Sequence, residues 1–109
     1  MKKGDIVLVD FPFTNLSQTK RRPALVLAVD AIDVTLAFIT SRLYQAQPGD
    51  VQLMPTAQNG LKVLSAVRVT KLATLARLLV HGRLGDLPAA DLIAVDAGLV
   101  LALSITVPA

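Results

Sequence analysis

The chain has 109 residues, of which 53% are hydrophobic, and its formal net charge is +3. This length suits one domain with one core, so we expect a single domain over residues 1–109, and the apolar composition excludes disorder. The absence of cysteine excludes a disulfide framework, and a lone histidine, His81, argues against a histidine-based metal site or a Ser-His-Asp triad. We therefore expect neither a metal nor another cofactor.

Short apolar segments separated by turn residues dominate the chain and predict a β-rich fold. The expected strands, in chain order, cover residues 5–11, 23–29, 34–39, 51–54 and 63–71, with residues 75–80 as the weakest candidate. Residues 12–20 are expected to form a loop, and residues 45–50, 55–60 and 81–86 to form turns.

A single helix is expected over residues 88–103. Leu92, Val95, Leu99 and Ala102 form an apolar stripe at helical spacing behind Pro88. Strands followed by one terminal helix predict a mainly β fold, either a strongly curved antiparallel sheet or a partly open barrel, closed by that helix.

No segment predicts a membrane span or a signal peptide. The apolar run 92–107 is short and contains Asp96, and Gly4-Asp5 interrupts the basic N-terminus. We expect a cytoplasmic protein that makes no membrane contact.

Charge is distributed unevenly along the chain. Nine Lys or Arg residues lie between Lys20 and Arg83, against three Asp, whereas residues 84–109 contain three Asp and no base. This pattern predicts a face that binds a polyanion. The chain contains no Glu.

The cationic run Lys20-Arg21-Arg22 directly precedes Pro23 and an apolar strand. Proline biases the preceding residue toward extended geometry, which fixes Arg22 at the start of the strand. A guanidinium held there suits phosphate binding. A solvated cationic turn explains the run equally well.

Period-two geometry in residues 63–71 places Arg68 and Thr70 on one face and Val67 and Val69 on the other. A solvated strand face is the alternative; the pattern favours function for Arg68 and is neutral for Thr70. Asp10 is interpreted as a solvated strand end and His81 as an exposed turn residue.

Six motifs follow one another over nearly the whole chain: KGDIVLVDFP (3–12), RPALVL (22–27), ITS (39–41), LSAVRV (64–69), LATL (72–75) and LGDL (84–87). In this order and spacing they resemble the MazF/PemK (Kid-like) toxins of type II toxin–antitoxin systems. The resemblance implies an SH3-like barrel with helices and a homodimer. It also implies a metal-independent, sequence-specific endoribonuclease for single-stranded RNA, inhibited by a cognate antitoxin, whose complex with the toxin is expected to reach operator DNA.

By the same resemblance, Arg22, Thr40 and Arg68 are expected to act in catalysis. Arginine can stabilise the charge that develops on phosphate, whereas a threonine hydroxyl can position a phosphate oxygen or the 2′-OH. The expected RNA-binding residues are Phe13, Lys20, Arg21, Ser41, Arg42, Thr70 and Lys71.

Two departures from the family pattern concern the general base. Many members carry Glu in the first loop, where this chain has Ser17-Gln18-Thr19, and an acid two residues after the second arginine, where it has Thr70. A non-catalytic module that binds nucleic acid or protein on the same barrel is therefore the alternative function. A related branch that poisons DNA gyrase uses a C-terminal Trp, and this chain has no Trp.

Overall fold

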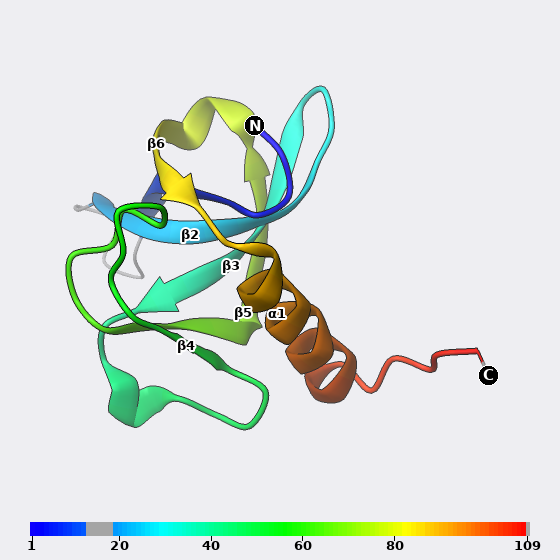
Figure 1. The fold of residues 1–109 in the computed structure, drawn as a ribbon. Helices are drawn as coiled ribbons and strands as arrows, with labels where there is room; N and C mark the ends of the chain where they lie inside the picture. The colour runs from blue at the N-terminus through cyan, green and yellow to red at the C-terminus, as the bar shows by residue number, and fades with distance from the viewer. Residues whose placement is uncertain (13–18, 109) are drawn as a thin grey trace.

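The computed structural model describes residues 1–12 and 19–108 (Figure 1). The elements are β1 (Asp5–Pro12), β2 (Thr19–Val29), β3 (Asp33–Thr40), the 3₁₀ turn η1 (Leu43–Gln45), β4 (Val51–Leu53), β5 (Ser65–Ala76), the 3₁₀ turn η2 (Arg77–Leu79), β6 (Val80–Asp86) and α1 (Ala89–Ala102).

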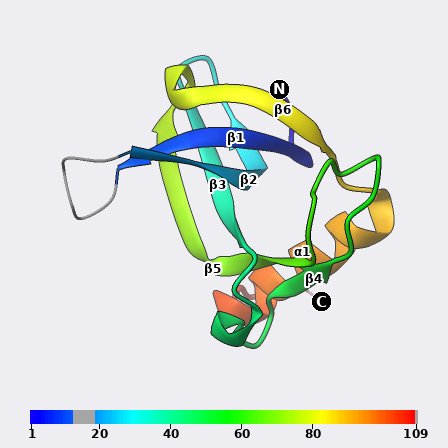
Figure 2. The same ribbon diagram turned by 90° about the vertical axis from the view of Figure 1, so that its left-hand side faces the viewer.

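The strands form one bent antiparallel sheet in the order β4-β5-β3-β2-β1-β6. The sheet curls strongly but does not close into a barrel, and α1 lies against β4 and β5 (Figures 1 and 2). The expected fold class, a strongly curved antiparallel sheet with a C-terminal helix, is confirmed.

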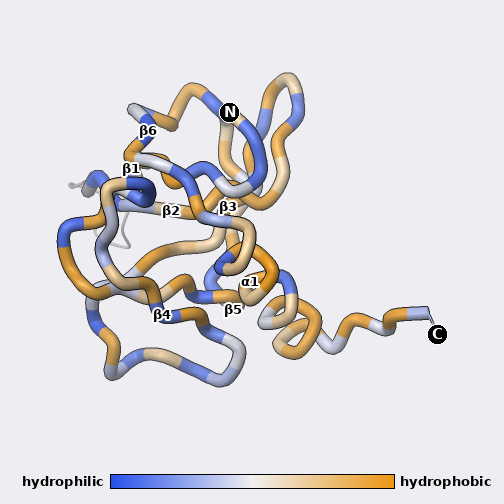
Figure 3. The backbone as a smooth tube through the Cα atoms, viewed as in Figure 1, coloured by the Kyte–Doolittle hydropathy of each residue, from blue (hydrophilic) through white to orange (hydrophobic). Residues whose placement is uncertain are grey.

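Alternation along the strands divides the apolar side chains between two clusters. In β2, Leu25 belongs to the cluster beneath α1, whereas Ala24 and Val26 belong to the cluster on the other face. Full burial of a Val, Leu or Ile side chain contributes roughly 1.5–3 kcal/mol. Both faces of the central strands are therefore apolar, and Figure 3 shows hydrophobic stretches within the sheet.

Strand β2 begins earlier than expected, because the residues around Pro23 are extended rather than looped. Pro23 pairs with Leu8 of β1, while the β2–β3 pairing begins at Ala24. The proline, which cannot donate a backbone hydrogen bond, therefore lies where β2 has no assigned partner on its β3 side.

The expectations for residues 75–86 were wrong. Leu75 and Ala76 continue β5, and the segment expected to be a turn is strand β6, paired with β1. Of the two glycines that suggested a turn, Gly85 has a packing reason instead. A Cβ on Gly85 would lie 2.0 Å from the carbonyl oxygen of Gln58, so only glycine allows the loop to contact β6 there.

The helix prediction is confirmed. Pro88 occupies the N-cap position of α1, and the stripe Leu92, Val95, Leu99 and Ala102 packs into the cluster beneath the helix.

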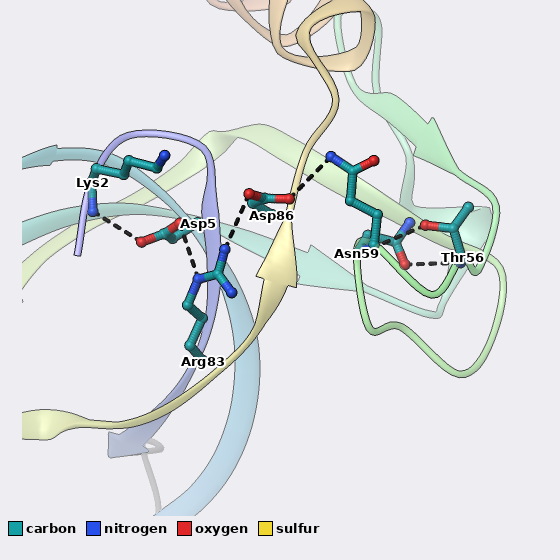
Figure 4. Close-up of polar contacts among 7 residues, drawn as sticks. Lys2, Asp5, Thr56, Asn59, Arg83 and Asp86 are labelled. Atoms are coloured by element: carbon teal, nitrogen blue, oxygen red, sulfur yellow. Dashed lines mark hydrogen bonds and ion pairs between the residues drawn. The ribbon is translucent and has the colours of Figure 1, made fainter.

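The loop between β4 and β5 is held rigidly by Asn59, whose side chain is buried. Its Oδ1 accepts hydrogen bonds from the backbone N–H groups of Thr56 at 3.0 Å and Leu61 at 2.9 Å, and its Nδ2 donates to the Met54 carbonyl at 2.8 Å. These hydrogen bonds hold the backbone of the β4–β5 loop in one conformation (Figure 4).

Ion pairs attach the same region to the N-terminal strand. Arg83 of β6 bridges Asp5 and Asp86 at 3.2 and 3.1 Å, and Asp86 accepts a hydrogen bond from the Gln58 side chain at 3.0 Å (Figure 4). The end of β6, the start of β1 and the β4–β5 loop therefore form one unit.

Candidate functional site

A cavity of about 370 Å³ opens where β2, β3 and β5 meet at one end of the sheet. Its lining residues are Arg22, Phe38, Ile39, Thr40, Arg42, Gln45, Arg68, Lys71, Leu72 and Ala73. We call this cavity the cationic cleft. The three residues expected in catalysis thus converge on one concave surface although they are far apart in the sequence.

Strand register explains why Arg22 and Thr40 meet. Ala24 of β2 pairs with Phe38 of β3, so the same antiparallel register continued by two residues puts Arg22 across from Thr40. Both side chains therefore lie on the sheet face of Ala24 and Phe38.

A bulge in β5 explains how Arg68 and Lys71 share the cleft. Ile39 pairs with Val67 and Ala37 pairs with Leu72, so residues 68–71 lie opposite the single residue Phe38. Extra residues bend a strand and redirect its side chains. Simple alternation, which grouped Arg68 with Thr70, fails here: Thr70 is exposed and does not line the cleft.

The described lining of the cleft is strongly cationic. It contains Arg22, Arg42, Arg68 and Lys71 and no Asp, Glu or His. Four cations around one hollow favour a ligand with several negative charges, such as a phosphodiester chain. Phe38 packs against the second apolar cluster and also lines the cleft.

The Thr40 hydroxyl has a structural contact within the cleft. Its Oγ1 accepts a hydrogen bond from the backbone N–H of Arg42 at 3.0 Å, which fixes the turn after β3. A hydroxyl that accepts can still donate its proton to a second oxygen. Thr40 can therefore hold Arg42 at the rim while contacting a ligand.

Asp50 lies beside the cleft, and sequence reasoning missed it. Its Oδ2 is 2.8 Å from Nε of Arg68, an ion-pair distance, although the N–H bond does not point along this line. The side chain of Asp50 is 2% exposed. The β4–β5 register, with Val51 opposite Val67, puts Asp50 opposite Arg68. The pair could therefore have been predicted only from the pairing of the two strands, not from the local sequence.

A second hollow of about 360 Å³ adjoins the cleft and shares Arg22 and Ile39 with it. Ser41 lines this hollow and not the cleft, together with Lys62, Ser65 and a mostly apolar set comprising Leu8, Pro23, Gly60, Leu61, Val63 and Leu84. Ser65 is buried, and its hydroxyl donates to the Val63 carbonyl at 2.9 Å.

Arg21 faces away from the cleft. Its Nε is 3.2 Å from Oδ1 of Asp10, and Oδ2 of the same carboxylate is 2.6 Å from Nε2 of His81. Strand β6 places His81 beside Asp10, so the expected turn at His81 was wrong, although its side chain is exposed as expected. Asp10 lies near the end of β1 and is partly exposed, as expected, but it contacts both Arg21 and His81. Phe13 lies outside the described residues, and so does the side chain of Lys20.

Two further findings concern the described residues only. No helix in residues 1–12 and 19–108 is long and apolar enough to cross a membrane. In the same ranges, no three His, Cys, Asp or Glu side chains are grouped so that they could hold a metal ion.

The fold and the cleft define a small, open, antiparallel β-sheet protein with a cationic site at one end of the sheet. A sequence profile of PemK-like, MazF-like toxins of type II toxin–antitoxin systems matches residues 2–103. The chain belongs to this toxin family. No curated protein sequence is significantly similar to it.

Solved structures agree with this assignment. The chain is similar to MazF from Deinococcus radiodurans, with 28% identity over 96% of this chain and 97% of that chain and a TM-score of 0.73. A MazE–MazF complex from the same organism has 26% identity over 97% and 98% and a TM-score of 0.72. An endoribonuclease in complex with its cognate antitoxin from a mycobacterial species has 20% identity over 99% of both chains and a TM-score of 0.78, which supports the fold.

Proposed function

We propose that this protein is the toxin of a type II toxin–antitoxin system and acts as an endoribonuclease on single-stranded RNA. The observation that carries the proposal is the convergence of Arg22, Thr40 and Arg68 on one cationic cleft. A cognate antitoxin is the expected inhibitor, and a similar endoribonuclease is known in complex with its cognate antitoxin. The chain is further proposed to form a homodimer and to reach operator DNA through the antitoxin complex.

The proposed reaction uses the RNA's own 2′-OH and needs no metal. The 2′-oxygen attacks the adjacent phosphorus while the bond from phosphorus to the 5′-oxygen breaks. The proton lost from the 2′-OH is balanced by one gained at the leaving oxygen. The products are a 2′,3′-cyclic phosphate and a 5′-OH.

The cleft residues supply charge and position in this scheme. Arg22 and Arg68 stabilise the negative charge that builds on the phosphate oxygens, because guanidinium stays charged and can donate two parallel hydrogen bonds. Thr40 positions a phosphate oxygen or the 2′-OH. Arg42 and Lys71 bind the flanking phosphates.

Turnover is expected to be modest. No described residue of the cleft lining is a carboxylate or imidazole, and a positioned general base typically contributes about 10²–10⁴-fold. The remaining contribution comes from orientation and electrostatic stabilisation.

The experiment is to incubate pure protein with a long RNA in EDTA and to map the new ends. Cleavage at recurring short sequences, with 5′-OH and cyclic phosphate ends, supports the proposal. Arg22→Ala protein, purified in parallel, controls for a contaminating nuclease.

If the wild-type protein binds RNA but leaves it intact over a broad pH range, the non-catalytic binding module is the correct function. If cleavage occurs only when a divalent metal is restored, the metal-independent scheme is wrong.

A further inference from the structure

We propose that Asp50 is a positioning residue for the cationic cleft. Its carboxylate holds the guanidinium of Arg68 from the side that does not line the cleft. The inference rests on the proposed function for its effect on RNA, but the contact itself is independent of that function. Asp50 comes from the turn before β4, not from the strand that carries Arg68.

The turn that presents Asp50 has a defined geometry. Residues 47–50 form a β-turn in which the Asp50 N–H donates to the Gln47 carbonyl at 3.0 Å, with Pro48 and Gly49 between them. Gly49 has φ +92°, which a type II turn requires at its third residue. Proline and glycine thus fix the direction in which Asp50 leaves the turn.

The carboxylate is held by further backbone contacts. Oδ2 accepts from the N–H of Gln47 at 2.8 Å, and Oδ1 accepts from the N–H of Val69 at 2.9 Å. The second contact ties the turn to β5 immediately after Arg68. Since both oxygens have backbone donors, the carboxylate has little freedom to move away from the guanidinium.

Burial makes the pair between Asp50 and Arg68 different from a surface ion pair. The Asp50 side chain is 2% exposed and that of Arg68 is 11% exposed. Breaking a buried pair leaves a charge without compensation and is far more disruptive than breaking an exposed one. The pair uses Nε, so the two terminal nitrogens of Arg68 are not taken up by Asp50 and can face the cleft.

Asp50 is argued to act through Arg68 and not on RNA itself. It does not line the cleft, and its oxygens already accept backbone hydrogen bonds. It is therefore not a replacement for the missing general base.

The test compares wild type with Asp50→Asn, Arg68→Ala and the double variant, all assayed well below their unfolding temperatures. For Asp50→Asn we expect kcat to fall roughly 10-fold with KM little changed, less than the roughly 10²–10³-fold loss for removal of a charge-stabilising donor. In the Arg68→Ala background the same substitution is expected to cost less than about 2-fold, because coupled residues are not additive.

A spectroscopic readout separates this inference from the proposed function. The Nε–H resonance of Arg68, assigned by its absence in Arg68→Ala, is expected to shift in Asp50→Asn, because the negative charge 2.8 Å from Nε is removed. Asp33→Asn, a carboxylate in β3 far along the sheet from the cleft, is the matched control. Should Asp50→Asn not fold, Asp50→Ser replaces it.

An unchanged Arg68 resonance in the Asp50 variant would overturn the inference. So would equal kcat losses for the Asp50 substitution in the wild-type and Arg68→Ala backgrounds. If wild type neither binds nor cleaves RNA, the proposed function fails, while the resonance still decides whether Asp50 holds Arg68.

Discussion

Arg22 lies between the two hollows, on β2 beside β3. Its register places it opposite Thr40, and it lines both the cationic cleft and the adjoining hollow. A guanidinium at this junction can contact a phosphate whose neighbouring nucleotides extend to either side.

Arg22→Ala is expected to lower RNA cleavage by about 10²–10³-fold, the usual cost of losing one oriented donor. Arg22→Lys keeps the charge but loses the planar fork, so it is expected to retain RNA binding better than cleavage. Single-turnover cleavage and RNA affinity measure the two effects. Lys3→Ala is the control, because it removes one positive charge whose partner is Asp96 on α1. It should leave the cleavage rate and the RNA affinity unchanged. An equal loss in the Lys3 variant would indicate a general effect of net charge.

Thr40→Val tests the hydroxyl with little change in side-chain shape. The variant loses the acceptor for the Arg42 N–H, so we expect unfolding to become easier by about 1 kcal/mol and cleavage to fall more than RNA binding. Urea denaturation and single-turnover kinetics check the two expectations. Thr40→Ser should restore both, and a Ser variant as impaired as Val would show that the methyl group, not the hydroxyl, matters.

The residue types that line the cleft were readable from sequence, but cross-strand partners were not. Arg22, Thr40 and Arg68 were identified from their motifs. Lys71, rather than Thr70, joined Arg68 in the cleft because of a bulge that alternation does not encode. Asp50 was missed because its relation to Arg68 exists only once β4 and β5 are paired.

At the scale of elements, the contact between α1 and the turn before β4 links the helix to the cleft. A Cβ on Gly98 would lie 2.1 Å from the carbonyl oxygen of Gly49, the residue before Asp50. The helix thus presses against the turn that presents the Asp50 carboxylate.

Gly98→Ala is expected to destabilise the fold and to reduce RNA cleavage. Alanine favours a helix over glycine by about 1 kcal/mol, but overpacking typically costs about 1–3 kcal/mol, so the clash outweighs the helical gain. Thermal unfolding and cleavage assays measure both effects. Ala97→Gly, on the exposed side of α1, should cost about 1 kcal/mol in stability without loss of activity; a more stable Gly98→Ala protein would contradict the proposed contact.

The β2–β3 turn depends on the Asp30 carboxylate. Its Oδ1 accepts from the N–H groups of Asp33 at 2.7 Å and Ile32 at 2.8 Å. These two hydrogen bonds, with the nearby Arg77, lower the pKa of Asp30 below its usual value of 3.8. A lowered folded-state pKa means that the stabilisation is present above pH 3.8 and is lost as the pH falls through the folded-state value.

Asp30→Asn is therefore expected to be less stable than wild type at pH 7, and the difference should disappear as the pH falls below the folded-state pKa of Asp30. Urea denaturation over a pH series measures it. Asp91→Asn, in the first turn of α1, controls for loss of one carboxylate. If the difference in unfolding free energy between wild type and Asp30→Asn does not depend on pH, the shape of the side chain rather than its charge stabilises the turn.

Helices and strands were predicted correctly where the apolar pattern was clear. Prediction failed where glycine could indicate either a turn or a tightly packed strand. The stripe in α1 and the apolar runs of β1, β2 and β3 were recognised correctly. Gly82 and Gly85 suggested a turn, yet both lie in strand β6, and residue 85 is glycine because the backbone of residues 58–59 approaches it closely. That approach depends on the fold of a loop more than twenty residues earlier.

For the whole molecule, the distribution of apolar surface on α1 predicts self-association. The inner stripe packs against the sheet, but the helix is apolar on its outer side as well. Ile93, Val100 and Leu101 are exposed there, and the tail that follows adds Leu103, Ile105 and Val107. Several exposed apolar side chains close together on one helix and the tail that follows it mark an interaction surface.

We expect a second copy of the chain to cover this surface, so the mass in solution should be twice the 11.5 kDa of one chain. Ile93→Glu and Leu101→Glu place a charge in the contact and are expected to give monomers, because burial of an unpaired charge is strongly unfavourable. Light scattering coupled to size exclusion measures the mass. Ile32→Glu is the matched control, since Ile32 is 72% exposed at the far β2–β3 turn. A monomeric wild type, or a dimer that both helix variants preserve, would place the association surface elsewhere.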